Sequence, residues 1–257
     1  MGSLIPAGAD LLWIDDSGGD GEPLVLLHPG IADSAIWHRL LPLLGARRVV
    51  RFDRRGFGQS PIATEPFQAV TDLVAVLDHL SADRVHLVGN SMGGETSLAL
   101  AITDPTRIAS MTLLCPGIGG YPWPDPSPED QELYARYGAA KEARDIGTLV
   151  EIGLAEWYRS GADDYLAGQM RRAVEADFAQ ESLELDNPEQ WDALGDLRIP
   201  TAVIAGELDP ADSLQASIDL ADRIPDAELV RLDADHVPQY REPEAVADVV
   251  LRTVARA

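Results

Sequence analysis

Residues 85–94 read VHLVGNSMGG, and residues 95–102, which follow directly, read ETSLALAI. The first segment begins with the apolar run of a buried strand, and the second is rich in residues that favour helix. Between them lies Gly-x-Ser-x-Gly, with Ser91 at its centre. Glycine on both sides, at Gly89 and Gly93, lets a strand and a helix close around a sharp turn that presents the serine hydroxyl above the sheet. The stretch therefore predicts a strand–turn–helix unit with Ser91 as a nucleophile.

The same alternation of strand and helix recurs along the chain. Leu24–Leu27 and Val203–Ala205 are continuous apolar runs, which are typical of strands buried on both faces of a parallel sheet. Apolar residues repeat every three to four positions over 70–80 and 246–254, as in helices that pack on a sheet. The sequence predicts an α/β fold, a mostly parallel central sheet with flanking helices. Its strand candidates are Leu11–Ile14, Leu24–Leu27, Val49–Phe52, Arg84–Val88, Ser110–Cys115, Thr201–Ala205 and Glu228–Leu232.

Residues 117–197 depart from this alternation. Prolines at 122, 124, 126 and 128 exclude regular structure there, and no strand signal appears in the remainder. We expect residues 1–116 and 198–257 to form the core, and residues 117–197 to form an inserted helical lid. Helices that merely pack on a large sheet are the alternative. The helical patterns of this segment cover Leu133–Ala143, Ile146–Trp157 and Ala162–Phe178.

A serine hydroxyl needs a general base, and the chain has five histidines. Only His236 lies in a polar loop, between the last strand candidate and the final helix. Loops carried by a rigid scaffold are typical sites for a general base, so His236 is the predicted base. Three of the others, His38, His79 and His86, are expected to be structural or to lie at the surface, and His28 is expected to make local hydrogen bonds at the end of a strand.

The base in turn needs a carboxylate to orient it. Asp209 follows a strand candidate, at the end of the sheet where Ser91 and His236 are expected. We predict that Asp209 is this acid. Glu207 and Asp212 are rivals from the same loop.

Backbone N–H groups are expected to bind the oxyanion that forms during attack. Met92, directly after the nucleophile, is one predicted donor. The other belongs to the loop of residues 28–31, where Pro29 has no N–H to give. Gly30 or Ile31 remains, and Gly30 is our prediction.

Taken together, these residues resemble the α/β-hydrolase family, in which Ser, Asp and His follow one another in this chain order. HPG at 28–30, DRRGFGQS at 53–60, GELD at 206–209 and DHVP at 235–238 are similar to loops of the family. The chain departs from the family pattern at Pro29 and at Asp235, where glycine is usual.

Within the family, the chain resembles small bacterial esterases, enol-lactonases and cofactor-free perhydrolases. The resemblance implies cleavage of a carboxylic ester or lactone of a small, moderately apolar substrate through an acyl-enzyme on Ser91, without a metal or cofactor. Ile31, Trp123, Trp157 and Val237 are expected to contact that substrate. The turn also resembles that of C–C hydrolases that act on meta-cleavage products. Acyl transfer, as in perhydrolases, and a ligand-binding receptor on the same scaffold are further alternatives.

The formal net charge of −23 bears on the partners of the protein. An acidic surface repels nucleic acid and anionic membranes, which leaves a small-molecule substrate as the expected partner. No apolar run approaches the roughly 20 residues that span a bilayer, and the first residues lack the features of a signal peptide, so we expect a cytoplasmic protein. Cys115, the only cysteine, is expected to be a core residue.

Overall fold

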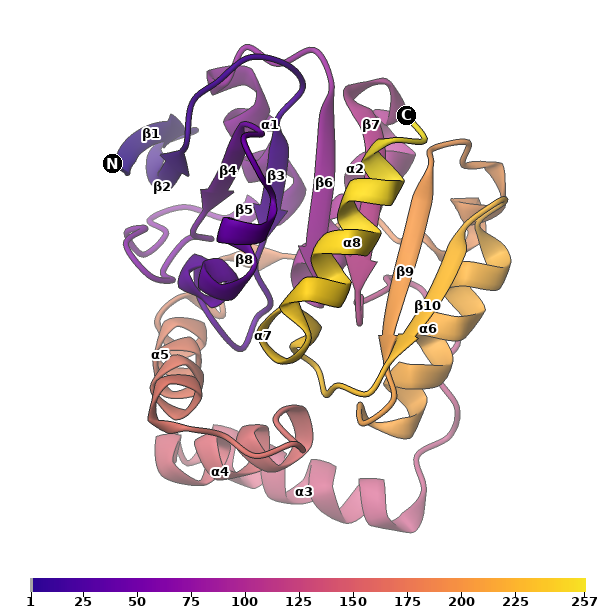
Figure 1. Cartoon of the computed structure of the whole chain (residues 1–257). Coiled ribbons are helices and arrows are strands. Elements are labelled where there is room, and N and C mark those ends of the chain that lie inside the picture. Colours follow the sequence, from indigo (N-terminus) through magenta and orange to yellow (C-terminus); the bar gives the residue numbers. More distant parts are fainter. Residues whose placement is uncertain (1) are drawn as a thin grey trace.

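The computed structural model describes residues 2–257 as an eight-stranded sheet with helices on both faces (Figure 1). β1 and β2 run antiparallel to their neighbours and all other neighbours are parallel, which confirms the predicted fold class. Each strand candidate overlaps an observed strand, whereas β1, a short edge strand that contains a proline, was not predicted. In sheet order the strands are β1 (Ser3–Ala7), β2 (Asp10–Asp16), β4 (Val49–Phe52), β3 (Leu24–Leu27), β6 (Val85–Asn90), β7 (Ile108–Leu114), β9 (Thr201–Gly206) and β10 (Glu228–Leu232).

Two apolar cores lie on opposite faces of the sheet because successive side chains of a strand point to opposite sides. Val25 and Leu27 of β3 join the core under α1, α2 and α6, and Leu24 and Leu26 join the core under η1 and α8. Within residues 2–257, every helix is too short or too polar to pass through a membrane. The α-helices are α1 (Ala69–His79), α2 (Met92–Thr103), α3 (Pro128–Glu142), α4 (Ile146–Trp157), α5 (Asp164–Gln180), α6 (Ala211–Arg223), α7 (Pro238–Arg241) and α8 (Pro243–Val254). The 3₁₀ helices are η1 (Ser34–Arg39), η2 (Leu41–Leu43), η3 (Pro105–Arg107) and η4 (Trp191–Asp196).

The chain between β7 and β9 forms α3, α4 and α5, which lie beyond the carboxyl ends of the parallel strands (Figure 1). Two expectations for this segment are wrong. A two-residue strand, β8 (Glu184–Leu185), pairs with β5 (Phe67–Gln68), and neither is long enough to show a periodic signal. Pro128 belongs to α3 rather than to irregular chain. It occupies the first turn, where no N–H is needed, after a capping box between Ser127 and Asp130.

Buried ion pairs of Arg55 fix the DRRGFGQS turn (residues 53–60), which follows β4. Arg55 binds Asp72 of α1 through Nε and Nη2, at 2.8 and 2.7 Å, and also pairs with Asp10 of β2. Its Nη2 donates to the carbonyl of Ala7 at 2.9 Å. Because a buried guanidinium needs such partners, the motif ties the turn to the β1–β2 hairpin and to α1.

The turn between β6 and α2 requires two positions without side chains. A Cβ atom at Gly89 would lie 2.4 Å from the carbonyl oxygen of Gly93, and one at Gly93 would lie 2.2 Å from the carbonyl oxygen of Leu27 in β3. Both distances are far below van der Waals contact with rigid backbone. The glycines therefore allow β6, β3 and α2 to pack closely enough for the turn to form.

We expect Gly93→Ala to lower the free energy of unfolding by about 1–3 kcal/mol or more, because backbone must move to admit the methyl group. Gly138→Ala is the matched control. Gly138 is an exposed residue of α3 with open space around it, so alanine should stabilise the protein by roughly 0.5–1 kcal/mol. Denaturant unfolding followed by circular dichroism measures both. Equal stability of the two variants would contradict the packing argument.

Candidate active site

Ser91 occupies the turn between β6 and α2 in a strained conformation. Its φ of 53° and ψ of −117° lie outside the regions that residues with a side chain prefer. Its N–H donates to the carbonyl of Leu114 at 3.0 Å, and its carbonyl accepts from the amides of Glu95 and Gly117, both at 3.0 Å. The surrounding backbone holds the serine in this geometry.

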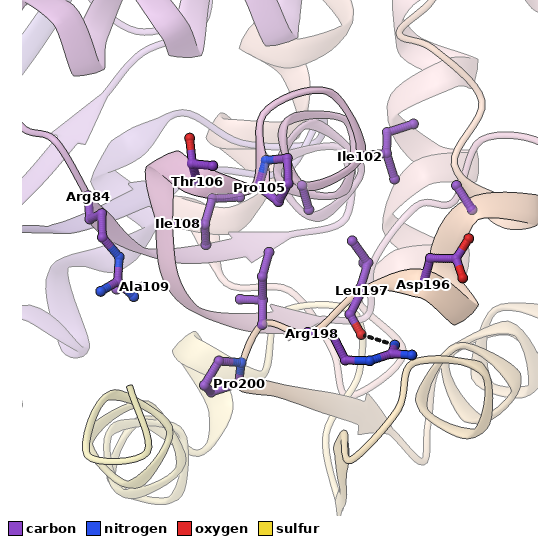
Figure 2. A pocket seen from close by; sticks show the side chains of 13 residues that line it. Arg84, Ile102, Pro105, Thr106, Ile108, Ala109, Asp196, Leu197, Arg198 and Pro200 are labelled. Atoms are coloured by element: carbon purple, nitrogen blue, oxygen red, sulfur yellow. Dashed lines mark hydrogen bonds between the residues drawn. The ribbon is translucent and has the colours of Figure 1, made fainter.

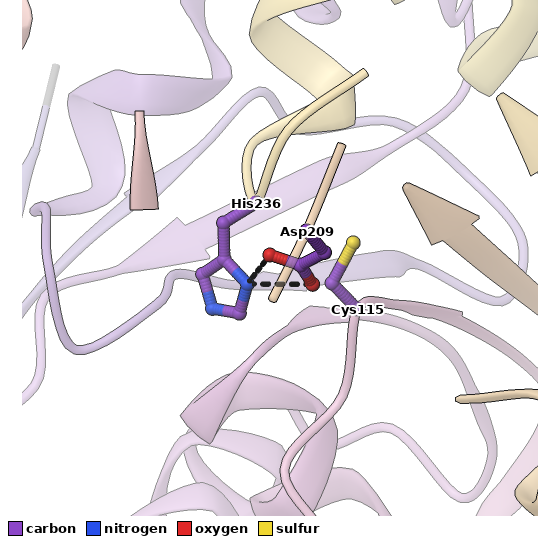
Figure 3. Close-up of side chains that lie close together, drawn as sticks. All are labelled: Cys115, Asp209 and His236. Carbon is purple, nitrogen blue, oxygen red and sulfur yellow. Dashed lines mark hydrogen bonds and ion pairs between the residues drawn. The ribbon is translucent and has the colours of Figure 1, made fainter. Parts of the chain in front are cut away.

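His236 and Asp209 form a buried pair at the same edge of the sheet (Figure 3). The Nδ1 atom of His236 lies 2.9 and 3.0 Å from the two carboxylate oxygens of Asp209. A carboxylate only accepts hydrogen bonds, so Nδ1 is the donor to Asp209, and in the neutral form of the ring Nε2 carries the free lone pair. The rival Glu207 is exposed and pairs with Arg231 at 3.0 Å.

Asn90 joins the serine turn to the histidine loop, a role that the sequence analysis missed. Its Nδ2 donates to the carbonyls of Leu114 and His236, at 2.9 and 3.0 Å, and its Oδ1 accepts from Nε2 of Gln239 at 2.8 Å. The only sequence signal is a polar residue at the end of a mostly apolar strand, and in the structure every residue of β6, Asn90 included, is buried.

Asp235, which stands beside His236 where glycine is usual in the family, holds the same loop in place. Its carboxylate accepts from Nη2 of Arg241 at 2.7 Å and from the amide of Ser160 at 3.0 Å. The N–H of His236 donates to the carbonyl of Trp157 at 3.3 Å. These bonds connect the loop to α7, to the last residue of α4 and to the chain that follows α4.

A cavity of about 310 Å³ lies between this edge of the sheet and helices α3–α5. Ser91 and His236 both line it, and so do four other residues that the sequence analysis singled out. Met92 is the first residue of α2, where amides have no acceptor within the helix. Gly30 packs directly on it, since a Cβ there would meet the sulfur of Met92 at 2.2 Å. The four residues are Gly30, Ile31, Met92 and Trp157.

Two predicted substrate contacts lie outside the cavity. Trp123 lies in the proline-rich segment and is 52% exposed. Its ring packs against that of Tyr121, with 4.8 Å between the centroids, and does not line the cavity. Val237 points into the core beside β9 and α8 and is fully buried. Trp157, in contrast, lies against His236, with 4.4 Å between the centroids of the two rings.

The cavity wall also carries charged side chains that the sequence analysis did not predict. Arg54 forms an ion pair with Glu184, and Lys141 lies 3.4 Å from the carboxylate of Asp177. The partners in each pair are more than thirty positions apart in the chain, so no local pattern reveals them. The one feature of the sequence that could have drawn attention to this part of the wall is that Lys141 is the only lysine of the chain.

A larger hollow of about 590 Å³ lies at the opposite ends of the strands (Figure 2). Its polar side chains include Arg84, Thr106 and Arg198, and Arg198 donates to the carbonyl of Leu197 at 2.7 Å. No nucleophile paired with a base is found among the residues that line it. Size alone therefore does not make it the candidate site.

Cys115 lies on the far side of Asp209 from His236, and the ligand atoms of the three residues fall within 4.8 Å of one another (Figure 3). Burial, and then the neighbouring charge of Asp209, raises the pKa of the Cys115 thiol well above its ordinary value. A metal would need the thiolate and would compete with the proton on Nδ1. The arrangement suits a protonated thiol beside the Asp209 carboxylate better than a metal site.

A sequence model of the alpha/beta hydrolase fold family matches residues 22–243, and the chain belongs to this family. It is 29% identical over 266 residues to a 2-hydroxy-6-oxononadienedioate/2-hydroxy-6-oxononatrienedioate hydrolase of Klebsiella pneumoniae, with 96% of this chain and 91% of that protein covered. A solved structure of Est816, described as an N-acyl homoserine lactone degrading enzyme, has a TM-score of 0.76 and 28% identity, with 97% and 99% covered. A thermophilic esterase from Thermogutta terrifontis has a TM-score of 0.75 and 26% identity, with 99% of both chains covered. The family and these relatives identify the chain as a hydrolase.

We expect Cys115 to resist thiol reagents in the folded protein. At about pH 8, near the ordinary pKa of a thiol, a group whose pKa is raised stays protonated, and burial blocks access to it. Modification by iodoacetamide should be roughly 100-fold slower than in denaturant, where the thiol is exposed and partly ionised. Mass spectrometry follows the rate. Equally fast labelling of folded and unfolded protein would contradict this placement.

Proposed function

We propose that the protein hydrolyses a carboxylic ester or lactone of a small, moderately apolar substrate through an acyl-enzyme on Ser91. The observation that carries the proposal is one cavity lined by a strained serine, a histidine paired with a buried carboxylate, and the two predicted amide donors. The cavity is also lined by Tyr137 of α3, Leu149 of α4 and Met170 of α5, which supports a lid role for residues 117–197.

The proposed reaction begins with attack of the Ser91 hydroxyl on the substrate carbonyl while Nε2 of His236 takes its proton. The amides of Gly30 and Met92 stabilise the oxyanion, and Asp209 stabilises the imidazolium. The tetrahedral intermediate then collapses, and His236 protonates the leaving alcohol. A water molecule, activated by the same histidine, attacks the acyl-enzyme and releases the acid.

Hydrolysis of a C–C bond is the second candidate. It is favoured by the Klebsiella pneumoniae relative, which is similar over nearly the whole chain and is named for 2-hydroxy-6-oxo dienedioates. Est816 and the Thermogutta terrifontis esterase, which are about as similar to this chain in sequence as the Klebsiella pneumoniae relative, favour hydrolysis of a lactone or an ester. The three reactions share a serine, a base and an oxyanion site, so substrate measurements must separate them.

Ser91→Ala should lower hydrolysis of a short-chain p-nitrophenyl ester by roughly 10³-fold or more, because the nucleophile is lost. Ser213→Ala, on α6 and outside the cavity, is the matched control and should keep full activity. Wild-type protein is compared on this ester, a γ-lactone and a 2-hydroxy-6-oxo dienoate. Tight reversible binding without Ser91-dependent turnover of any of them would overturn the proposal in favour of a receptor.

Asp209→Asn should lower kcat by roughly 10³–10⁴-fold with little change in KM, because an amide cannot stabilise the imidazolium. Glu207→Gln removes a carboxylate two residues away that pairs with Arg231 instead, and it should have little effect. Steady-state kinetics on the preferred substrate, with circular dichroism to check folding, measure both. A loss of less than about ten-fold in Asp209→Asn would mean that another group orients His236.

A further inference from the structure

The guanidinium of Arg54 lines the cavity beside Ser91 and is short of acceptors. The residue is only 7% exposed. Its Nη2 binds the carboxylate of Glu184, and its Nη1 faces only the sulfur of Met92, at 3.2 Å. Nε also has no partner, but it is enclosed by protein and cannot reach a ligand. Because sulfur is a weak acceptor, Nη1 has the capacity to donate to an oxygen in the cavity.

The backbone fixes Arg54 next to the predicted oxyanion loop. Its N–H donates to Nε2 of His28 at 2.9 Å, so Nδ1 of that ring carries the proton and donates to the carbonyl of Pro29 at 2.8 Å. Burial lowers the pKa of the His28 imidazole, which keeps the ring neutral in this role. Arg54 and the loop that contains Gly30 are thus held as one unit.

Each cationic side chain that lines the cavity already faces a carboxylate. Two cationic side chains, Arg54 and Lys141, face two carboxylates, Glu184 and Asp177. Half-buried Glu95, whose pKa is raised by burial, adds a further carboxyl group close enough to interact with Arg54 and Glu184. A substrate carboxylate would therefore add negative charge beside Glu184 without a free cation to balance it, whereas a neutral oxygen would accept from the guanidinium without that repulsion.

We propose that Arg54 determines specificity by binding a neutral acceptor oxygen, of the ketone or amide carbonyl type, that the substrate carries in addition to its scissile carbonyl. The inference rests on the proposed function of the cavity. It narrows the substrate class to esters or lactones with a second, uncharged carbonyl group.

Three acyl groups of equal length test the inference: the methyl esters of pentanoic acid and 4-oxopentanoic acid, and the monomethyl ester of butanedioic acid. They place a methylene group, a neutral carbonyl or a carboxylate at the same position. Butyl acetate, 3-oxobutyl acetate and 3-acetoxypropanoate present the same groups on the alcohol side. The second carbonyl can meet Arg54 from the acyl side or from the alcohol side. In at least one of the two series, kcat/KM of the wild type should therefore be about ten- to hundred-fold higher for the ketone than for its methylene counterpart.

Arg54→Lys and Glu184→Gln separate the hydrogen bond from the charge. Arg54→Lys keeps a cation opposite Glu184 but loses the planar fork of donors, so the ratio of ketone to methylene substrate should fall to near one. Glu184→Gln removes the neighbouring negative charge and should raise relative activity on the carboxylate substrate about ten-fold. Glu189→Gln, exposed and outside the cavity, changes the net charge equally and should leave both ratios unchanged.

Ratios within one variant are compared, so a general loss of activity cancels, and thermal unfolding shows that each variant is folded. A wild-type ratio near one in both series, or a ratio that Arg54→Lys leaves unchanged, would overturn the role of Arg54 while leaving the proposed function intact. A wild-type preference for the carboxylate substrate would overturn the neutral-oxygen assignment. Absence of Ser91-dependent hydrolysis of every ester and lactone tested would overturn the proposed function, and this inference with it.

Discussion

The candidate site depends on the close approach of backbone to backbone where β6 turns into α2. No side chain fits at Gly89 or Gly93, and the carbonyl of Leu27 in the adjacent strand limits the space. Because the turn is this tight, Ser91 is held at a positive φ and its hydroxyl stands at the carboxyl edge of the sheet. Neighbouring parallel strands end at the same edge, which brings the loops that follow β3, β9 and β10 to the serine.

Buried polar contacts then set the positions of those loops relative to one another. Asn90 binds the carbonyls of Leu114 and His236 and is held by Gln239, while the backbone of Gly206 lies so close to the loop after β10 that a Cβ would meet the carbonyl of Ala234 at 2.6 Å. Such groups have little freedom once their partners are satisfied. The distance between His236 and Asp209 is therefore a property of several loops together.

Charge acts differently at the surface and at the cavity. The chain has a net charge of −23, yet the charged residues along the cavity wall occur in opposite pairs. Exposed charges are screened by salt over roughly 10 Å, whereas partly buried pairs interact with little screening. Lys141 and Asp177 are exposed, so the more buried pair of Arg54 and Glu184 is the one that a substrate would sense with little screening.

The sequence by itself determined the features that are local in the chain. Short apolar runs located seven of the eight strands of the main sheet, and the glycine–serine turn and the polar loop at 233–238 located Ser91 and His236 as candidates. Only the tertiary structure decided what depends on residues far apart. It paired Asp209 rather than Glu207 with the histidine, placed Trp157 in the cavity and Trp123 and Val237 outside it, paired β5 with β8, and brought Arg54 to Glu184. The pairing of Asp209 with His236 arises because β9 and β10 lie side by side and end at the same edge of the sheet. Arg54 and Glu184, and likewise β5 and β8, meet because the chain between β7 and β9 packs over that edge, and no local pattern encodes a contact between segments more than a hundred residues apart.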